Sequence, residues 1–406
     1  MVMIRIGIIG KTNTGKTTFF NAATLLNAEI ANYPFTTKAP NYGIGYARTF
    51  CVCREFNVKD NPRNSACIEG FRFIPVEIVD LPGLIKGAWA GKGLGNQFLS
   101  VAAQADALLH VVDISGSVDA EGKVCDPGTG DPLRDVEDIE EELILWMTKI
   151  LEGKRGQILR LLESRRSRLK EALLTAFTGL RIDEFQILSA LKATGLEDRK
   201  FQEWTSDDLK SFVTALRRIA KPTVVVANKI DLPTAKENYE RLIAKLSPIP
   251  VVPCSAEAEL VLRRAEQKGF VKYIPGEEDF KVLDPSALTD KQKWALEYVQ
   301  QKVFSRWMRT GVQFAINVAV FKLLRMNAIY PVEDEKSLSD HDGNVLPDVF
   351  LMPQDATVSD LAREIHSDLA KTLLYAIDAR TGLKMPKEYV LRDRDVIKIV
   401  AASRRG

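Results

Sequence analysis

Residues 10–17 read Gly-Lys-Thr-Asn-Thr-Gly-Lys-Thr and fit the pattern G-x-x-x-x-G-K-[ST]. The stretch follows a short β-branched run at 4–9, which predicts a buried strand, and it opens a helix-compatible segment from Lys16 to about Asn27. Glycines in such a loop let backbone N–H groups surround phosphate oxygens, and the helix N-terminus adds a partial positive charge. The sequence therefore predicts a phosphate-binding loop at the carboxyl end of a strand.

Several side chains of this loop have an expected chemical role. Lys16 is expected to reach the β- and γ-phosphates of a nucleotide, and Thr17 to offer its hydroxyl to Mg²⁺. The predicted nucleotide-binding residues of the loop are Gly10, Asn13, Thr14, Gly15, Lys16, Thr17 and Thr18.

A second motif, Asp80-Leu81-Pro82-Gly83, follows the apolar run at 76–79. A carboxylate at the carboxyl end of a strand can hold Mg²⁺ through water, which makes Asp80 a predicted metal-site residue. Gly83, three residues later, can give its N–H to the γ-phosphate. Alone the pattern is weak, but after a phosphate-binding loop it becomes informative.

A third motif, residues 228–231, reads Asn-Lys-Ile-Asp and follows the apolar run at 224–226. The carboxylate of Asp231 can accept two hydrogen bonds from the N1–H and 2-amino groups of guanine, whereas adenine has no such donor pair. Asn228 is expected to bind N7 of the base or to brace the loop, and the Lys229 stem to cover the base. Ser255 and Ala256 end another strand, where a backbone N–H could read guanine O6.

The order of elements defines the fold class. Apolar strands at 4–9, 71–80, 107–113, 222–228 and 249–254 alternate with helical segments, which predicts an α/β fold with a mostly parallel sheet covered on both faces. All the motifs fall at carboxyl ends of strands, which is the side where open α/β sheets bind ligands.

The domain plan follows from where this alternation changes. We expect a nucleotide-binding domain at 1–275, interrupted by a helical insertion at about 120–219, then a helical connector at 276–316. Residues 317–406 form a predicted small β-rich domain, with strands at 318–324 and 395–400 and a short helix at 358–366.

With these motifs in place, three further stretches identify a family. They are the runs 32–37 (Asn-Tyr-Pro-Phe-Thr-Thr), 80–88 (Asp-Leu-Pro-Gly-Leu-Ile-Lys-Gly-Ala) and 93–99 (Gly-Leu-Gly-Asn-Gln-Phe-Leu). The chain resembles translation-factor-class GTPases of the Obg superfamily, above all the YchF-like branch, over nearly its whole length. Its last domain resembles a TGS domain, a ubiquitin-like β-grasp module. Obg itself has a glycine-rich domain ahead of the GTPase domain, and we expect this chain to lack it.

The resemblance carries expectations about the nucleotide and its hydrolysis. Many YchF-like proteins have a glutamate in place of Asp231 and prefer ATP, so the aspartate here predicts GTP. Ras-like GTPases orient water with a glutamine at the position of Leu84, so we expect slow hydrolysis.

Related GTPases with asparagine at the position of Asn13 use it to bind K⁺; the alternative is that Asn13 only braces the loop. Thr37, or alternatively Thr36, is the candidate hydroxyl for Mg²⁺ and the γ-phosphate. The candidate catalytic residues are Asn13, Lys16, Thr37 and Gly83.

Composition limits the partners. The 406 residues carry 56 Lys and Arg against 54 Asp and Glu, a net charge of +2, so a nucleic-acid surface must be a local patch. No apolar run is long enough to span a membrane, and no signal peptide is visible, so we expect a cytoplasmic protein with no membrane partner.

The resemblance implies a ribosome or RNA partner, and a monomer is favoured. An ATPase of the same fold and a nucleotide-stabilised adaptor remain alternatives. The candidate basic cluster consists of Arg160, Arg165, Arg166, Arg168 and Lys170.

The five cysteines do not form a disulfide framework, which fits a reducing compartment. Cys51 and Cys53 lie two residues apart and Cys67 follows. A zinc site usually has two close pairs, and the second pair is missing, so these residues are expected to be small apolar side chains on one face of a strand. His110, within a buried-strand pattern, is expected to be a core residue.

Overall fold

The computed structural model describes residues 3–25, 40–83, 87–90, 95–164 and 167–402. The chain divides into two compact units. One unit contains residues 4–43 and 77–315, and the other contains residues 1–3, 44–76 and 316–406. None of the helices in the described part of the chain combines the length and the apolar composition that crossing a membrane requires.

The main sheet has the strand order β2-β4-β1-β5-β6-β7, and β3 pairs with β4. Its strands are β1 (Arg5–Ile9), β2 (Asn41–Phe50), β3 (Ala66–Ile68), β4 (Phe71–Asp80), β5 (Ala107–Asp113), β6 (Thr223–Asn228) and β7 (Val251–Pro253). Neighbouring strands from β4 through β1, β5 and β6 to β7 are parallel, as predicted. Every residue of β5 is buried, which is what helices on both faces of a parallel sheet require.

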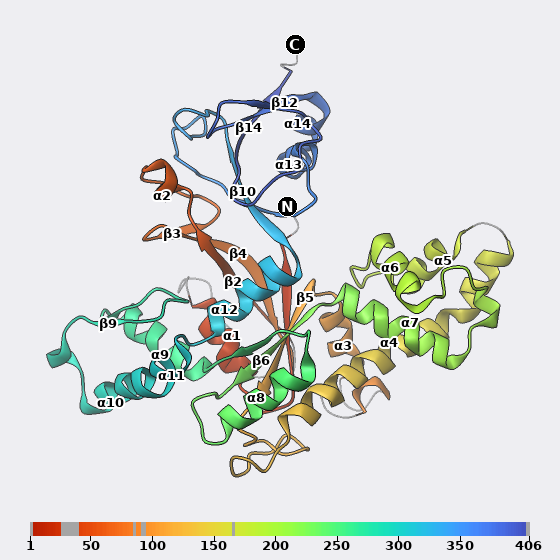
Figure 1. The fold of residues 1–406 in the computed structure, drawn as a ribbon, viewed down its shortest axis with the longest axis horizontal. Helices are drawn as coiled ribbons and strands as arrows, with labels where there is room; N and C mark the ends of the chain where they lie inside the picture. Colours follow the sequence, from red (N-terminus) through yellow and green to blue (C-terminus); the bar gives the residue numbers. More distant parts are fainter. Residues whose placement is uncertain (1–2, 26–39, 84–86, 91–94, 165–166, 403–406) are drawn as a thin grey trace. The chain divides into compact units, whose positions relative to one another are not determined.

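Helices accompany these strands in the order that the sequence predicts. They include α1 (Lys16–Thr24), α3 (Gly95–Ala103), α8 (Ala235–Leu246) and α9 (Ala256–Gln267), and α1 and α9 contact each other (Figure 1). His110 is buried in β5, and its burial lowers its pKa to about 3, so the imidazole is neutral. The prediction that His110 is a core residue is confirmed.

The insertion is helical, and its helices pack on one another rather than on the sheet alone. It contains α4 (Pro132–Glu163), α5 (Leu169–Ala176), α6 (Glu184–Thr194) and α7 (Ser206–Ala220), drawn from yellow to green in Figure 1. Asp131 caps α4 by accepting a hydrogen bond from the backbone N–H of Leu133, and Pro132 fills its first turn. Trp204 lies between Phe201 and Phe212, at ring-centroid distances of 4.9 and 5.4 Å, and anchors the insertion's core.

A hairpin of β8 (Val271–Lys272) and β9 (Lys281–Val282) spans the start of the predicted connector at 276–316. It is followed by α10 (Asp290–Val299), a π-helical turn (Gln300–Phe304) and α11 (Ser305–Trp307). Next come α12 (Val312–Asn317) and a π-helical segment (Val318–Leu323). The prediction of a strand at 318–324 is therefore wrong. A short β-branched run is compatible with either a buried strand or a buried helix, and here the buried Val318, Ala319 and Val320 belong to a helix.

The unit that holds the C-terminal residues has a five-stranded sheet in the order β11-β10-β14-β12-β13. Its strands are β10 (Met326–Val332), β11 (Phe350–Pro353), β12 (Leu373–Asp378), β13 (Lys384–Met385) and β14 (Val396–Ala401), with helices α13 (Val358–Ile365) and α14 (Ser367–Thr372). The mixed sheet and α13 form the predicted β-grasp-like domain. Residues 44–76, with the short helix α2 (Cys53–Phe56), belong to the same compact unit as this domain. The two compact units therefore divide the chain differently from the predicted domains at 1–275, 276–316 and 317–406. Those domain limits stay a prediction.

Candidate nucleotide-binding site

At two positions in the loop between β1 and α1, the backbone has a conformation that only glycine adopts readily. Gly10 has φ of +144° and Gly15 has φ of +94°. A Cβ atom on Gly10 would lie 2.3 Å from the carbonyl oxygen of Val111, and one on Gly15 would lie 2.2 Å from Nδ2 of Asn228. The loop thus combines the conformation and the close packing that leave backbone N–H groups available to phosphate oxygens.

Lys16 is buried at the start of α1, and its Nζ donates a 2.5 Å hydrogen bond to the carbonyl oxygen of Lys11. Burial lowers the pKa of Lys16 to about 8, although the nearby carboxylate of Asp80 acts in the opposite direction. A phosphate would supply the negative charge that this buried ammonium needs.

Thr17 and Asp80 form a candidate magnesium site. The Thr17 hydroxyl donates a 2.9 Å hydrogen bond to Oδ2 of Asp80. The other oxygen, Oδ1, is buried and has no hydrogen-bond partner among the described residues, and burial raises the pKa of this carboxyl group. Hydroxyl and carboxylate oxygens are the ligands that Mg²⁺ prefers, so these two residues fit the ion that the motifs imply.

Asn228 braces the site. Its Nδ2 donates a 2.8 Å hydrogen bond to the carbonyl oxygen of Thr14, and its Oδ1 accepts a 3.0 Å bond from the backbone N–H of Ala256. One side chain therefore joins the phosphate loop to the Ser255–Ala256 turn. Of the two roles expected for Asn228, the structure shows the bracing one.

Lys229 has a left-handed backbone, with φ of +63°, and its Nζ lies 2.8 Å from Oδ2 of the buried Asp113. Asp113 also accepts bonds from the hydroxyl groups of Ser115 and Ser117. This network fixes the position of the Lys229 ammonium group, and the role of its stem in covering a base stays a prediction.

Asp231 has a partner that the sequence did not indicate. The hydroxyl group of Tyr298, on α10, donates a 3.0 Å hydrogen bond to Oδ2 of Asp231. Burial, as the main cause, and the negative charge of Asp231, as the second, raise the pKa of Tyr298 to about 12. The phenol therefore stays protonated at neutral pH. Tyr298 therefore orients the carboxylate expected to read guanine. No local pattern links the two residues, because they lie 67 positions apart.

The segment after Asp80 contacts both the phosphate loop and the insertion. A Cβ atom on Gly83 would lie 2.4 Å from Oγ1 of Thr12, so Gly83 packs directly on the loop. Further along, the backbone N–H groups of Gly87 and Trp89 donate 2.6 and 2.9 Å hydrogen bonds to the buried carboxylate of Glu142 on α4. Sequence reasoning missed Glu142, since one acidic residue in an acidic helix carries no signal.

Asn13 and Lys11 add two contacts of the phosphate loop. Asn13 has φ of +62°, and its Nδ2 donates a 2.9 Å hydrogen bond to the carbonyl oxygen of Gly122. Lys11 Nζ lies 2.5 Å from Oδ1 of Asp135, which is also on α4. The insertion helix thus touches the phosphate loop as well as the segment that follows Asp80.

Several predicted residues are not placed by the structure. Thr36, Thr37, Leu84, Arg165 and Arg166 lie outside the described residues. Of the remaining basic cluster, Lys170 pairs with Glu184, and Arg160 donates to the carbonyl oxygen of Gly156. Thr18 is half-buried on α1, one residue after Thr17.

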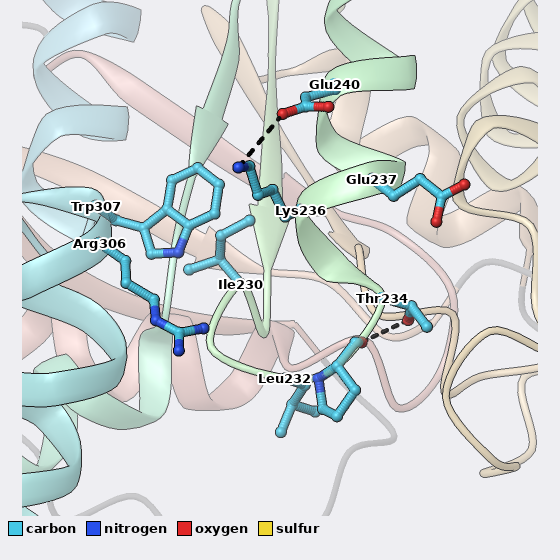
Figure 2. Close-up of a pocket in the computed structure, with 9 residues that line it drawn as sticks. Ile230, Leu232, Thr234, Lys236, Glu237, Glu240, Arg306 and Trp307 are labelled. Carbon is cyan, nitrogen blue, oxygen red and sulfur yellow. Dashed lines mark hydrogen bonds and ion pairs between the residues drawn. The ribbon is translucent and has the colours of Figure 1, made fainter.

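A cavity of about 770 Å³ lies beside the Asn228–Asp231 loop. Figure 2 shows Trp307 and Arg306 on one side of Ile230 and the α8 residues Lys236 and Glu240 on the other. None of the predicted phosphate-binding residues lines this cavity, so it is not the candidate nucleotide site.

The contact of Glu142 leads to a first prediction. Glu142→Gln should speed amide hydrogen exchange at Gly87 and Trp89 by about 10–100-fold, because hydrogen bonds to a charged acceptor contribute about 1.5–3 kcal/mol. Exchange measured by mass spectrometry on the peptide that spans these residues tests this. Glu141→Gln, which changes an exposed neighbour on the same helix, is the control. Equal exchange in the two variants would contradict the assigned contact.

Comparison with known proteins gives matches over the same regions. A family model described as a 50S ribosome-binding GTPase matches residues 5–155. A model of the Obg-like GTPase YGR210-like, G4 motif-containing domain matches residues 226–334, and a TGS domain model matches residues 342–401.

Individual relatives extend these matches to the whole chain. An uncharacterized GTP-binding protein of Methanocaldococcus jannaschii is 43% identical over 402 residues, which cover 99% of this chain and 100% of the relative. The ribosome-binding ATPase YchF of Bacillus subtilis is 31% identical over 281 residues, 67% of this chain and 68% of the relative. The crystal structure of a GTP binding protein from Pyrococcus horikoshii superposes with a TM-score of 0.79 at 35% identity, covering 98% of this chain and 100% of that one.

Proposed function

Because the chain belongs to the Obg-like GTP-binding proteins, with YchF-like relatives and a C-terminal TGS domain, we propose that it slowly hydrolyses GTP and changes conformation with the nucleotide state. The observation that carries the guanine preference is Asp231, held by Tyr298 at the end of the base-reading loop. The alternative of an ATPase rests on the names of relatives. It is disfavoured because adenine has no donor pair for an aspartate.

Hydrolysis in this proposal depends on positioning and charge rather than on a general base. Lys16 neutralises the β- and γ-phosphates, and Gly83 gives its N–H to the γ-phosphate. Mg²⁺, when bound by Thr17 and Asp80, with Thr37 as the further proposed ligand, offsets phosphate charge. The leucine at position 84 has no group that can orient water, so the intrinsic rate is slow.

Potassium is proposed as an activator through Asn13. The hydrogen bond of Asn13 to Gly122 uses the amide nitrogen, whereas a cation would bind the amide oxygen, so bracing and cation binding are compatible. An effect of K⁺ on the rate that is lost in Asn13→Ala would therefore place Asn13 among the residues that act on the phosphates.

The conformational change is proposed to reach the insertion through α4. Glu142 holds the segment after Asp80, and Lys11 of the phosphate loop pairs with Asp135 on the same helix. A γ-phosphate that draws in Gly83 would pull on the bonds to Glu142.

The proposed partner is the ribosome, on the strength of the names of the matched family and of the YchF relatives. Sedimentation with ribosomes at several salt concentrations, with a GTP analogue or GDP, tests it, because contacts to phosphate weaken steeply with salt. Binding that depends on the nucleotide supports the proposal, and its absence at low salt contradicts it. We propose that the protein acts as a monomer in the cytoplasm.

Single-turnover GTP hydrolysis is the direct test of the activity. Rates are measured in K⁺ and in Na⁺, with and without ribosomes. Slow turnover that ribosomes accelerate supports the proposal. Tight GTP binding with no hydrolysis under any of these conditions would favour a nucleotide-stabilised adaptor that displays the TGS domain, and equal rates in the two cations would remove the role of K⁺.

A further inference from the structure

Three thiols and a carboxylate converge in the unit that contains the C-terminal domain. Cys51 follows β2, Cys53 opens α2, and Cys67 lies in β3. The sulfur atoms and a carboxylate oxygen of Asp60 all lie within 4.8 Å of one another. The expectation that these cysteines are small apolar residues on one face of a strand is therefore wrong, because the chain turns between Cys51 and Cys53 and brings both to Cys67.

Two separations within the cluster are close to those of a tetrahedral metal site. Zinc bound to sulfur at about 2.3 Å and to oxygen at about 2.0 Å gives tetrahedron edges of about 3.8 Å between two sulfurs and about 3.5 Å between sulfur and oxygen. The Sγ atoms of Cys53 and Cys67 lie 3.8 Å apart, and Sγ of Cys51 lies 3.2 Å from Oδ2 of Asp60. All four donor atoms lie within 4.8 Å of one another, so movements of about an ångström bring the cluster to zinc geometry.

The charge around the cluster also suits a metal with thiolate ligands. A zinc ion bound by three thiolates and one carboxylate carries a formal double negative charge, which a buried site must offset. Arg72 is fully buried beside the cluster, and its guanidinium donates 2.9 Å hydrogen bonds to Asp60 and to the hydroxyl group of Ser65. This arginine also donates to the backbone carbonyl of Leu346, which fixes its orientation.

The segment that carries the ligands has little regular structure of its own. Between β2 and β4 it contains only the four-residue α2 and the three-residue β3. Bonds from Asn61 to Asn344 and from Arg63 to Asp348 hold it to the C-terminal domain within the same unit. Small segments with few core residues commonly depend on a metal or a disulfide for stability.

We propose that Cys51, Cys53, Cys67 and Asp60 bind one structural Zn²⁺. All four ligand positions come from the protein, so no position remains for substrate, which is the arrangement of a structural site. Thiolate ligands in a tetrahedron favour zinc over the hard cations Mg²⁺ and Ca²⁺. The site joins the turn after β2 to β3 and so stabilises the segment 51–68 against the C-terminal domain.

Metal analysis of the full chain, purified without chelators, is the first test. Mass spectrometry of the native protein should find about one zinc per chain in the wild type, and less than about a tenth of that in Cys67→Ser. Cys125→Ser changes a cysteine outside the cluster and should keep the zinc. Unchanged GDP affinity in Cys67→Ser would show that the nucleotide-binding unit still folds, so that zinc loss reports on the site.

Cobalt gives a readout that does not depend on any variant. Exchange of the wild-type metal for Co²⁺ should produce thiolate-to-metal charge-transfer absorption and the visible bands of a tetrahedral site. Asp60→Asn should weaken metal binding but keep the charge-transfer band, because the three thiolates remain. Two results would overturn the proposal. One is a wild type that holds no zinc, takes up no Zn²⁺ or Co²⁺ and shows accessible thiols. The other is a mass lower by two hydrogens together with a peptide in which a disulfide joins Cys53 to Cys67.

Discussion

Asp231→Asn is expected to lower the affinity for GDP and GTP by about 10²–10³-fold, because two hydrogen bonds to a charged acceptor contribute about 1.5–3 kcal/mol each and are only partly replaced. The same variant should prefer xanthosine nucleotides. Xanthine has a carbonyl group where guanine has the 2-amino group, and an asparagine can donate to it. Competition titrations of wild type and variant with GDP, XDP and ADP measure both effects.

Tyr298→Phe is the matched control for this prediction. It removes the hydroxyl that donates to Oδ2 of Asp231 but keeps the ring that packs on Trp294 at 5.5 Å. The loss of one hydrogen bond should weaken GDP binding by about 2–10-fold without changing the order of preference among bases. An Asp231→Asn protein that still prefers guanine would disprove the assignment of the base-reading residue.

The titration with ADP also decides between the two nucleotide classes. Wild-type affinity for GDP far above that for ADP supports the GTPase proposal. Similar affinities would mean that the aspartate does not discriminate, and would favour the ATPase alternative drawn from the relatives' names.

The parts of the site that the sequence predicted are those whose geometry is local. Gly10 and Gly15 occupy backbone conformations that only a short loop between a strand and a helix imposes, so the motif specifies them directly. Thr17 and Asp80 meet because parallel strands deliver their loops to the same edge of the sheet. The motif positions, at the carboxyl ends of parallel strands, were therefore enough to assign both residues to one predicted metal site.

Contacts made by distant helices were not predictable in this way. Tyr298 reaches Asp231 from the connector, and Glu142 reaches Gly87 and Trp89 from the insertion. The residues that Tyr298 and Glu142 contact depend on how the long helices pack against other elements. The periodicity of the sequence does not specify that packing. The cysteines show the same limit, since pair spacing describes ligands on one continuous loop, whereas Cys67 arrives from a separate strand.

Lys16→Met is expected to lower the GTP affinity by about 10–100-fold, because the variant loses a charge-assisted hydrogen bond to phosphate. Loss of this preorganised cation should reduce the single-turnover rate by about 10²–10³-fold. Methionine keeps most of the buried volume of the side chain, so the loop should not collapse. Lys236→Met, which removes an exposed lysine of α8, is the control.

The pH dependence of binding gives an independent signature of Lys16. Burial lowers the pKa of this lysine to about 8 in the free protein, below its ordinary value of 10.5, so the unfolded chain binds more protons between these values. The stability of the free protein should therefore rise with pH across this window, and the penalty of the buried charge is fully present below pH 8. Bound phosphate favours the ammonium, so nucleotide binding takes up a proton and weakens by up to about tenfold per pH unit above the lowered pKa.

Calorimetric titration with GDP at several pH values, in buffers that differ in ionisation enthalpy, measures this proton uptake. The wild type should take up a proton above pH 8, the pKa of its free Lys16, and Lys16→Met should not. Other groups that titrate in this range are common to both proteins and cancel in the difference. Identical pH profiles for wild type and variant would mean that Lys16 does not face the phosphates. That result would contradict the role assigned to Lys16 in the phosphate-binding loop.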